Sequence, residues 1–177
     1  MRYFYGYEDT DRIAETAAIY QKTDGDIKAL VRHLLTHAAL LTAPPALKRP
    51  FDYVVSALRA TEAETDGKTG VIDHLAKMGQ ELFQWPMPDG YPDKTAAWTG
   101  SLLARWNFAT ALMQGQVGGT AIELPKGATV DTLIARLLGR RADDPTLADL
   151  RASLLAHASA PGDVAALLLA SPAFQWR

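Results

Sequence analysis

The sequence predicts an all-α protein, an irregular multi-helix bundle with a proline-rich loop and at most one short β segment. Apolar residues recur every three or four positions along most of the 177 residues, which is the period of a helix buried on one face. The alternation typical of strands never persists beyond a few residues, and prolines and capping residues separate the helical stretches. We expect a single helical domain over residues 1–177, with N-terminal helices in 1–60, core helices and the proline loop in 70–115, and C-terminal helices in 128–177.

Two helices are expected before the first pair of prolines. The first spans residues 11–22 and turns Ile13, Ala17 and Tyr20 inward. A Thr-Asp-Gly-Asp turn then caps a second helix, which begins at Ile27. The inward positions of this second helix are Ile27, Leu30, Val31, Leu34, Leu35 and Ala38.

The pair Pro44-Pro45 breaks the chain, and Pro50 opens a third helix, because proline is favoured at the first helical position. The inward face of this helix is expected to consist of Phe51, Val54, Val55 and Leu58. The segment 61–69 that follows is polar and is expected to be loosely structured.

A fourth helix is expected over residues 71–83, with Gly79 in the middle of its apolar stripe. Glycine inside a helix costs about 1 kcal/mol relative to alanine, so we expect another helix to approach closely at this position. Gln80 lies at the edge of the same stripe, where its amide can hold the proline loop 86–92. The inward positions are Ile72, Leu75, Ala76, Leu82 and Phe83.

The longest helix is expected over residues 95–113, followed by a flexible glycine-rich connection at 115–120. Residues 121–124 can form one short strand at most. Three short helices are then expected near 130–138, 145–157 and 164–170, with Asp144 capping the second and Pro145 at its first position.

Composition excludes several classes of function. The net charge of −2 argues against a nucleic-acid surface, which needs clustered Lys and Arg. The chain has no cysteine, so it has no disulfide, no thiolate metal site and no Cys nucleophile. There is no run of 18 apolar residues to span a membrane, and the aromatic start of the chain has no features of a signal peptide.

Arg105 is the most informative single residue. It lies on the apolar stripe of the 95–113 helix, among Trp98, Leu102, Ala109 and Leu112. A guanidinium in apolar surroundings must be paired or hydrogen-bonded, because a bare buried charge is unstable. Its partners can be carbonyls of the proline loop, a carboxylate such as Asp52, or an anionic ligand. Arg105 is therefore expected either to tie the long helix to the proline loop or to bind a ligand.

Four aromatic residues, Trp85, Tyr91, Trp98 and Trp106, gather around the proline loop. Aromatic side chains beside an arginine can form a groove for a carbohydrate or a peptide, and they can equally form a satellite core that pins the loop. The sequence leaves both interpretations open.

Other polar groups have simpler interpretations. His33 and His37 share one helix face at a spacing that suits a metal, but no third ligand is close in sequence, and we expect a solvated face. Asp52, Ser56 and Arg59 line one flank of their helix, which resembles a polar network at a helix interface. Ser56 has no histidine in register, so no nucleophilic site is predicted.

Several motifs in order resemble a large bacterial family, the domain of unknown function 1800. The matching pieces are Asp24-Gly25-Asp26, Leu47-Lys48-Arg49-Pro50-Phe51, Val54-Val55-Ser56-Ala57-Leu58-Arg59-Ala60, Met78-Gly79-Gln80, Pro88-Asp89-Gly90-Tyr91-Pro92-Asp93, Trp98 with Arg105, and the closing Ala170-Ser171-Pro172-Ala173-Phe174-Gln175. The resemblance covers nearly the whole chain. It departs at Ala173, where the family usually carries Glu.

The resemblance implies that family members are longer than this chain, which looks like their C-terminal portion, and that many are exported or periplasmic. It supplies no catalytic residue. Our first hypothesis is a non-catalytic structural or interaction module that packs on the N-terminal half of the same protein. The alternatives are a module for an anionic or sugar-like ligand, and part of a hydrolase site that the other half completes. We predict no cofactor and no metal, and the candidate ligand-binding residues are Arg105, Trp98, Tyr91, Gln80, Arg59 and Lys48.

Overall fold

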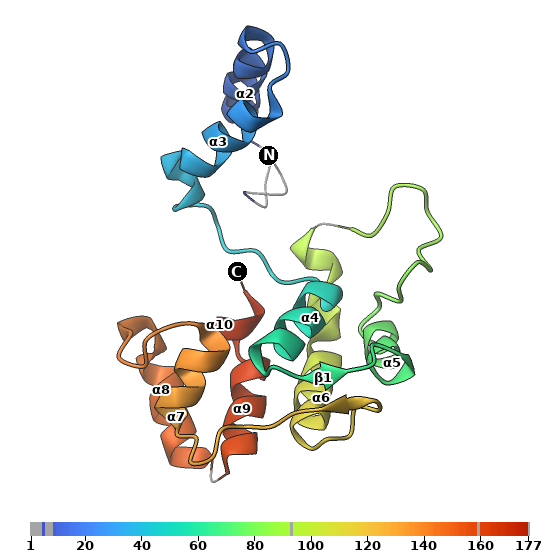
Figure 1. The fold of residues 1–177 in the computed structure, drawn as a ribbon, viewed down its shortest axis with the longest axis vertical. Coiled ribbons are helices and arrows are strands. Elements are labelled where there is room, and N and C mark those ends of the chain that lie inside the picture. The colour runs from blue at the N-terminus through green and yellow to red at the C-terminus, as the bar shows by residue number, and fades with distance from the viewer. Residues whose placement is uncertain (1–4, 6–8, 93, 159, 177) are drawn as a thin grey trace. The chain divides into compact units, whose positions relative to one another are not determined.

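The computed structural model describes residues 5, 9–92, 94–158 and 160–176, and these residues form a mostly helical fold, as predicted (Figure 1). The chain divides into two compact units, residues 1–46 and residues 47–177. This boundary falls inside the segment 1–60 that was expected to hold the N-terminal helices. The interpretation of the chain as a single domain stays a prediction.

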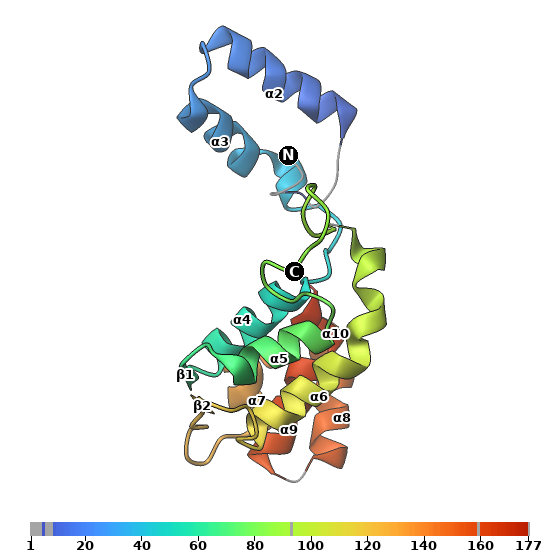
Figure 2. The ribbon, with the colours of Figure 1, turned by 90° about the vertical axis from the view of Figure 1, so that its right-hand side faces the viewer.

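The smaller unit is built on a helical hairpin (Figure 2). Its elements are α2 (Thr10–Lys22), α3 (Ile27–Thr36) and the 3₁₀ turn η1 (Ala38–Leu40). The carboxylates of Asp9 and Asp26 cap α2 and α3 by accepting hydrogen bonds from backbone amides of the first turn. Gly25 has a φ of 81°, which lets the chain reverse between the two helices.

The core of the smaller unit is small and consists of Tyr5, Leu34 and Ala39, with Leu40 and Ala43 packed against it. The Tyr5 hydroxyl donates a hydrogen bond to the Leu34 carbonyl at 2.7 Å. The predicted inward face of α2 is wrong, because Ile13, Ala17 and Tyr20 are all exposed. The helix lies where the periodicity predicts it, but in the described part of this unit no third element covers that face.

In α3 the predicted face is only partly right. Leu34 is buried, whereas Ile27 and Leu35 are exposed. The ten residues of α3 pack on α2 along one side, and this hairpin is too thin to enclose all the apolar positions of its two helices.

The larger unit contains the remaining elements. Its first half consists of α4 (Pro50–Ala60), β1 (Glu64–Thr65), α5 (Thr69–Lys77), the 3₁₀ turns η2 (Thr95–Ala97) and η3 (Thr99–Ser101), α6 (Leu102–Met113) and β2 (Thr120–Ala121). Its second half consists of α7 (Val130–Leu133), the π-helix η4 (Ile134–Leu138), the 3₁₀ turn η5 (Pro145–Leu147), α8 (Ala148–His157), α9 (Pro161–Ala170) and α10 (Pro172–Gln175). The strands β1 and β2 form an antiparallel ribbon that pairs Glu64 with Ala121 and Thr65 with Thr120.

The helix α4 begins at Pro50 as predicted, but its buried face is shifted. Val54 is buried as expected, together with Tyr53 and Ala57, whereas Phe51 is exposed. Tyr53 was not expected inside. It can be fully buried because its hydroxyl donates to the Arg105 carbonyl at 3.1 Å, which satisfies its one polar group.

The helix predicted over 71–83 ends at Lys77, six residues early. Gly79 has a φ of 83° and closes the helix end, with its amide donating to Ala76 and the Gln80 amide donating to Leu75. This is the glycine-terminated Schellman arrangement. A Cβ at Gly79 would meet no atom within 4 Å, so the predicted close helix crossing at this residue is wrong. Beyond it Phe83, predicted to face inward, is 96% exposed.

The close approach occurs at Gly70 instead, at the start of α5. A Cβ there would lie 2.1 Å from the carbonyl oxygen of Gly118, in the turn before β2. Only two residues without side chains allow these two backbone segments to touch. Gly118 lies in the connection 115–120 that was expected to be flexible, and Gly70 directly follows the segment 61–69 that was expected to be loosely structured.

The predicted 95–113 helix is interrupted, since η2 and η3 precede a shorter α6. Within it Trp98, Arg105, Ala109 and Leu112 are buried as predicted, whereas Leu102 is 40% exposed. The helical phase of α6 is therefore correct from Arg105 onward. The predicted strand at 121–124 is realised as β2, one residue earlier.

The three predicted C-terminal helices are present, and Asp144 and Pro145 cap and open the second as expected. Two hydrophobic clusters meet at α9, whose residues from Val164 to Ala170 are all apolar. Leu169 packs with α4, α5 and α6, while Val164 and Leu168 pack with α7, η4 and α8. The short α10 was not predicted.

The two glycine environments give a matched stability test. Gly79→Ala and Gly79→Leu should each destabilise the fold by about 1 kcal/mol, because a side chain resists a positive φ but has free space. Gly70→Ala should cost about 3 kcal/mol, since two backbones must separate. Urea denaturation measures all three. A larger loss for Gly79→Leu than for Gly79→Ala would restore the close-crossing interpretation.

The pH dependence of stability should report on His74 of α5, whose ring meets Phe108 edge-on at 5.2 Å. Partial burial, reinforced by Lys77 and opposed by Asp73, lowers the pKa of His74 below its ordinary value of 6.5. The unfolded chain therefore binds a proton at His74 more readily than the folded chain does. Neutral His74 thus contributes its full share to the free energy of unfolding above about pH 6.5, and this share is lost as the pH falls through the folded-state pKa. Between pH 7.5 and pH 5, the free energy of unfolding measured by chemical denaturation should fall less for His74→Gln than for the wild type. The exposed-site control His157→Gln should leave this fall unchanged.

Candidate binding site

The candidate site is built around Arg105, the largest side chain that the fold buries completely. Its relative exposure is 0%, which confirms the expectation that it points inward from α6. Ser101 precedes it by one helical turn, so the start of α6 places a hydroxyl beside the guanidinium. The side chain thus leaves an apolar helix and reaches a small group of polar residues from distant parts of the chain.

Each guanidinium nitrogen has a different environment. Nε donates to the Ser101 hydroxyl oxygen at 3.0 Å, and Nη1 reaches the Gln175 side-chain oxygen at 3.5 Å. Nη2 is buried and has no hydrogen-bond acceptor among the described residues. The ring of Tyr53 lies 5.2 Å from the guanidinium carbon, within cation–π range.

The described residues give Arg105 no counter-charge. Asp52, which was expected as a partner, pairs with Arg49 at 3.1 Å. Burial lowers the pKa of Arg105 from its ordinary value, with a smaller opposing effect from Tyr53, and burial raises the pKa of the Tyr53 phenol. The Arg105 guanidinium is thus a buried cation whose hydrogen-bond partners are neutral, which is uncommon in proteins.

The connection from Arg105 to the proline loop is indirect. The Ser101 hydroxyl donates to the Trp98 carbonyl at 2.7 Å, and the Trp98 indole N–H donates to the Pro92 carbonyl at 2.9 Å. The guanidinium itself reaches Ser101 and Gln175, and not the loop carbonyls that were expected. The helix and the loop are therefore linked through a relay of side chains.

Three of the four aromatic residues that were expected to gather around the proline loop lie together. The rings of Trp85 and Tyr91 lie 4.8 Å apart, and those of Tyr91 and Trp98 lie 6.1 Å apart. Trp98 is buried and its N–H is already used, so it offers no face to a sugar ring. Trp106 does not join the stack, because its indole N–H donates to the Ala170 carbonyl at 3.2 Å. This arrangement resembles a satellite core more than a groove.

The other predicted site residues divide into two groups. Lys48 converges with Arg105 on α10, since its backbone amide donates to the Gln175 carbonyl at 2.8 Å and its ammonium lies 3.9 Å from the centre of the Phe174 ring. Gln80 is buried, and its oxygen accepts from the Phe51 amide at the start of α4 at 2.8 Å instead of holding the proline loop as expected. Arg59 is exposed near the end of α4 and joins neither group.

Sequence reasoning missed three members of the polar group around the guanidinium, Tyr53, Ser101 and Gln175. Ser101 was accessible to it, because it lies one turn before Arg105 on the same helix face. Gln175 is 70 residues away, so no local spacing could connect it to Arg105. The one signal in the sequence was a polar Gln beside Phe174 and Trp176 in the closing segment.

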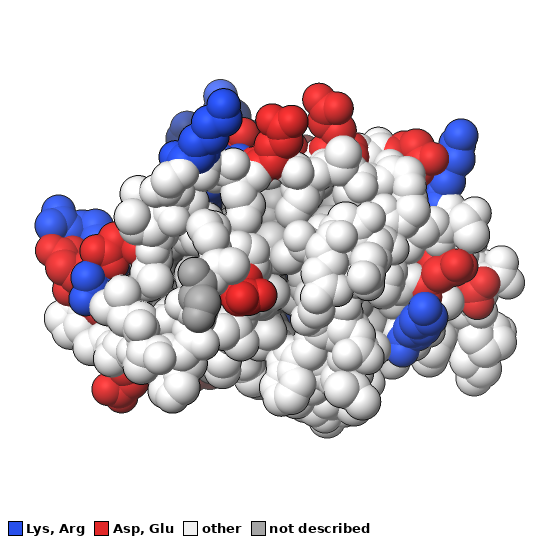
Figure 3. Space-filling model, turned by 90° about the horizontal axis from the view of Figure 1, so that it is seen from below, with Lys and Arg blue, Asp and Glu red and all other residues white. Residues whose placement is uncertain are grey.

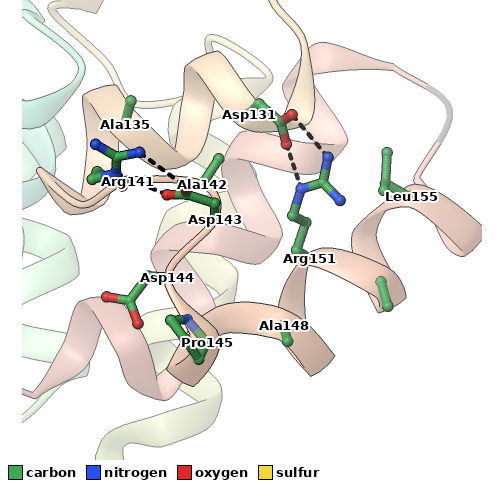
Figure 4. A pocket seen from close by; sticks show the side chains of 11 residues that line it. Asp131, Ala135, Arg141, Ala142, Asp143, Asp144, Pro145, Ala148, Arg151 and Leu155 are labelled. Carbon is green, nitrogen blue, oxygen red and sulfur yellow. Dashed lines mark hydrogen bonds and ion pairs between the residues drawn. The ribbon is translucent and has the colours of Figure 1, made fainter.

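A surface cleft of about 710 Å³ opens between α7 and α8 (Figure 4). Arg151 reaches Asp131 through two contacts, at 2.6 and 2.8 Å, and Arg141 pairs in the same way with Asp143, at 2.9 and 2.8 Å. Hydrogen bonds from these guanidiniums lower the pKa values of both aspartates. The pair Asp131–Arg151 joins α7 to α8 across the cleft, and Arg141 and Asp143 pair within one loop, so the charges of these four residues compensate one another.

A second cleft, of about 570 Å³, lies beside the β ribbon. Arg136 of the π-helix donates to the Thr61 carbonyl at 3.3 Å and pairs with Glu62 at 3.1 Å. Glu62 has a φ of 53°, a left-handed conformation that glycine usually occupies at a helix end. The ion pair with Arg136 accounts for a charged residue at this position.

The histidine pair shows no metal-site geometry. His37 accepts a hydrogen bond from the Ala39 amide at 3.1 Å and lies 2.7 Å from a nitrogen of Arg12, so its ring caps η1. His33 meets His37 edge-on at 5.7 Å. In the parts of the chain that are described, no three His, Cys, Asp or Glu residues are grouped to hold a metal ion.

The observations define a mostly helical protein with a buried arginine at the meeting point of α4, α6 and α10. The family comparison then identifies it: the model of a protein family of unknown function (DUF1800) matches residues 1–176, and the chain belongs to this family. This confirms the resemblance based on the motifs. No curated protein and no solved structure matches the chain. Among the described helices, none is both long and apolar enough to cross a membrane.

The buried charge and the hydrogen bonds of Arg105 predict how three substitutions of this residue rank in stability. Arg105→Lys should destabilise by about 1–3 kcal/mol, because a charge stays buried while the planar set of donors is lost. Arg105→Met should cost less, since it fills the space without a charge, and Arg105→Ala should cost most because of the cavity it leaves. Chemical denaturation in a chloride buffer tests the order. If Arg105→Met is the least stable of the three, the guanidinium has a stronger partner than the neutral neighbours described.

Proposed function

We propose that this chain is a non-catalytic structural and interaction module whose smaller unit presents an apolar helical face to another protein segment. The supporting observation is the surface of the hairpin. Its exposed large apolar side chains are Ile13, Tyr20, Ile27, Leu35 and Leu41, each about half exposed or more. Ile13 and Tyr20 lie two turns apart on the same side of α2.

The energetics of the hairpin support this proposal. Isolated helices of ten to thirteen residues are marginal in water, and most helical stability in proteins comes from packing of an apolar face. Among the described residues, the core of the smaller unit contains three buried hydrophobic residues, whereas five large hydrophobic residues are exposed. Burying one such side chain stabilises by about 1.5–3 kcal/mol, so a partner covering several of them would contribute more than the internal core does.

The partner we propose is the N-terminal half of the same protein, as the family resemblance implies. A nucleic acid is a poor partner for this chain, because its net charge is −2. One face of the molecule, seen from below, is mostly uncharged, with Lys, Arg, Asp and Glu gathered towards its edges (Figure 3). That face has no concentration of basic residues to bind phosphates.

Two alternatives stay proposals with weaker support. A module for a sugar-like ligand would need an accessible aromatic face, but Trp98 is buried and bonded to Pro92. Part of a hydrolase site would need an activated polar group at a cleft, and in the cleft between α7 and α8 the carboxylates of Asp131 and Asp143 are paired with arginines. The exposed hairpin is the feature that these alternatives leave unexplained.

Mutation of the hairpin face tests the proposal. The chain is mixed with the N-terminal half of a longer family member, and association is measured by calorimetry and by amide hydrogen exchange of α2 and α3. Ile27→Ser and Ile13→Ser should each weaken binding about tenfold, because each removes about 1.4 kcal/mol or more of apolar burial.

The control is Lys28→Ser, which changes an exposed polar residue on α3 and should leave the affinity unchanged. Equal affinities for wild type, Ile13→Ser and Ile27→Ser would reject the hairpin as the contact surface. Absence of any association would reject the N-terminal half as the partner.

A further inference from the structure

We propose that the buried guanidinium of Arg105 is a binding site for an oxyanion, a carboxylate or phosphate group that reaches it when α10 opens. This site lies wholly within the larger unit, so it is independent of the hairpin and of the proposed docking function. Three features of the guanidinium suit an oxyanion: its orientation is fixed, its two terminal nitrogens lack good hydrogen-bond acceptors, and no described residue supplies a counter-charge.

The orientation is fixed from one side. Nε donates to Ser101, whose hydroxyl is itself held by the Trp98 carbonyl. The Tyr53 ring lies against the guanidinium at 5.2 Å, and the Tyr53 hydroxyl is bonded to the backbone of Arg105 itself. These contacts prevent the planar group from turning to find other acceptors. A preorganised guanidinium of this kind loses little entropy when it binds an anion.

The edge formed by Nη1 and Nη2 is the part that lacks acceptors. Nη1 has one contact, to Gln175, at the outer limit of a hydrogen bond, and Nη2 has none among the described residues. Two nitrogens of a guanidinium side by side form the pair of parallel donors that carboxylates and phosphates accept bidentately. The unsatisfied edge therefore matches an oxyanion better than any neutral group around it.

The charge environment favours an anion as well. Arg105 is fully buried, and no ion pair with a described carboxylate compensates it. The Lys48 ammonium lies over the ring of Phe174, next in sequence to Gln175, and adds positive potential to the same turn. In its desolvated surroundings the Arg105 guanidinium attracts an anion more strongly than it would in water.

The cover over this edge is α10, a helix of four residues. Hydrogen bonds hold its end: Gln175 is bonded to Ala170 at 2.7 Å and to the Lys48 amide at 2.8 Å, and Trp176 forms a bridge with Leu47. Phe174 anchors the same turn in the core, with its ring 5.9 Å from that of Tyr53, so an opening of α10 must also release this ring. Single helical turns open locally at a free energy well below that of global unfolding. Opening of α10 would remove the weak Gln175 contact and present the edge of Arg105 to an anion.

The test compares thermal unfolding of the whole chain in sodium phosphate and in sodium chloride at equal ionic strength, with sodium acetate as a third arm. Phosphate at about 20 mM should raise the Tm of the wild type by about 3 °C or more relative to chloride, because the anion binds only the folded state. A response to phosphate alone identifies a phosphate site, and a response to both anions identifies a general oxyanion site.

Three variants make the test specific. Arg105→Met should abolish the anion-dependent shift, and the exposed control Arg32→Met should retain it. Gln175→Glu places a carboxylate on the chain near Nη1, so it should also reduce the shift by supplying the anion internally. If Arg105→Met does not fold, Gln175→Glu decides the question. No shift in the wild type, or the same shift in every variant, would overturn the proposal.

Discussion

The packing of α9 is the constraint on which the larger unit depends. Its two hydrophobic clusters share this helix, with Leu169 in one and Val164, Ala165 and Leu168 in the other. From Val164 to Ala170 every residue of this helix is apolar, and all of them except Leu167 are buried or partly buried, so the stability of the helix depends on packing on both sides. Replacement of any of these residues would therefore be felt in both clusters, so the two halves of the larger unit should unfold together.

The arginine is a consequence of this packing. The closest helix pair of the unit is α6 with α9, and α10 follows α9 after a single residue, Ser171. Because α6 and α9 are held face to face, Arg105 and Gln175 are brought within 3.5 Å despite their separation in the chain. The hydrophobic contact thus determines where the polar residues meet, and the polar residues in turn determine what can bind there.

The sequence predicted the features that depend on local chemistry. Pro50, Asp26 and the pair Asp144-Pro145 start helices as expected, because capping and proline geometry involve only neighbouring residues. The inward direction of Arg105 also followed from the helical period. The end of α5 did not, because a glycine in an apolar stripe is equally consistent with a helix crossing and with a left-handed helix end.

Features that depend on distant contacts could not be predicted. The partner Gln175 and the fully buried Tyr53 depend on how α4, α6 and α10 assemble. The direction of α2 was also misjudged, because periodicity shows which side of a helix is apolar but not whether anything covers that side. In the hairpin, the apolar side of α2 lies where the periodicity predicts it, but that side is exposed.

The contact between Gly70 and Gly118 has a consequence for motion. Three contacts join the segment from Glu64 to Gly70 with the segment from Val117 to Ala121. These are the paired strands, a hydrogen bond from the Asp66 amide to the Gly119 carbonyl at 3.0 Å, and the contact between the two glycines. With side chains absent at the tightest point, the two backbones have no room to slide past each other. The start of α5, the ribbon and the turn after α6 should therefore move as one rigid body.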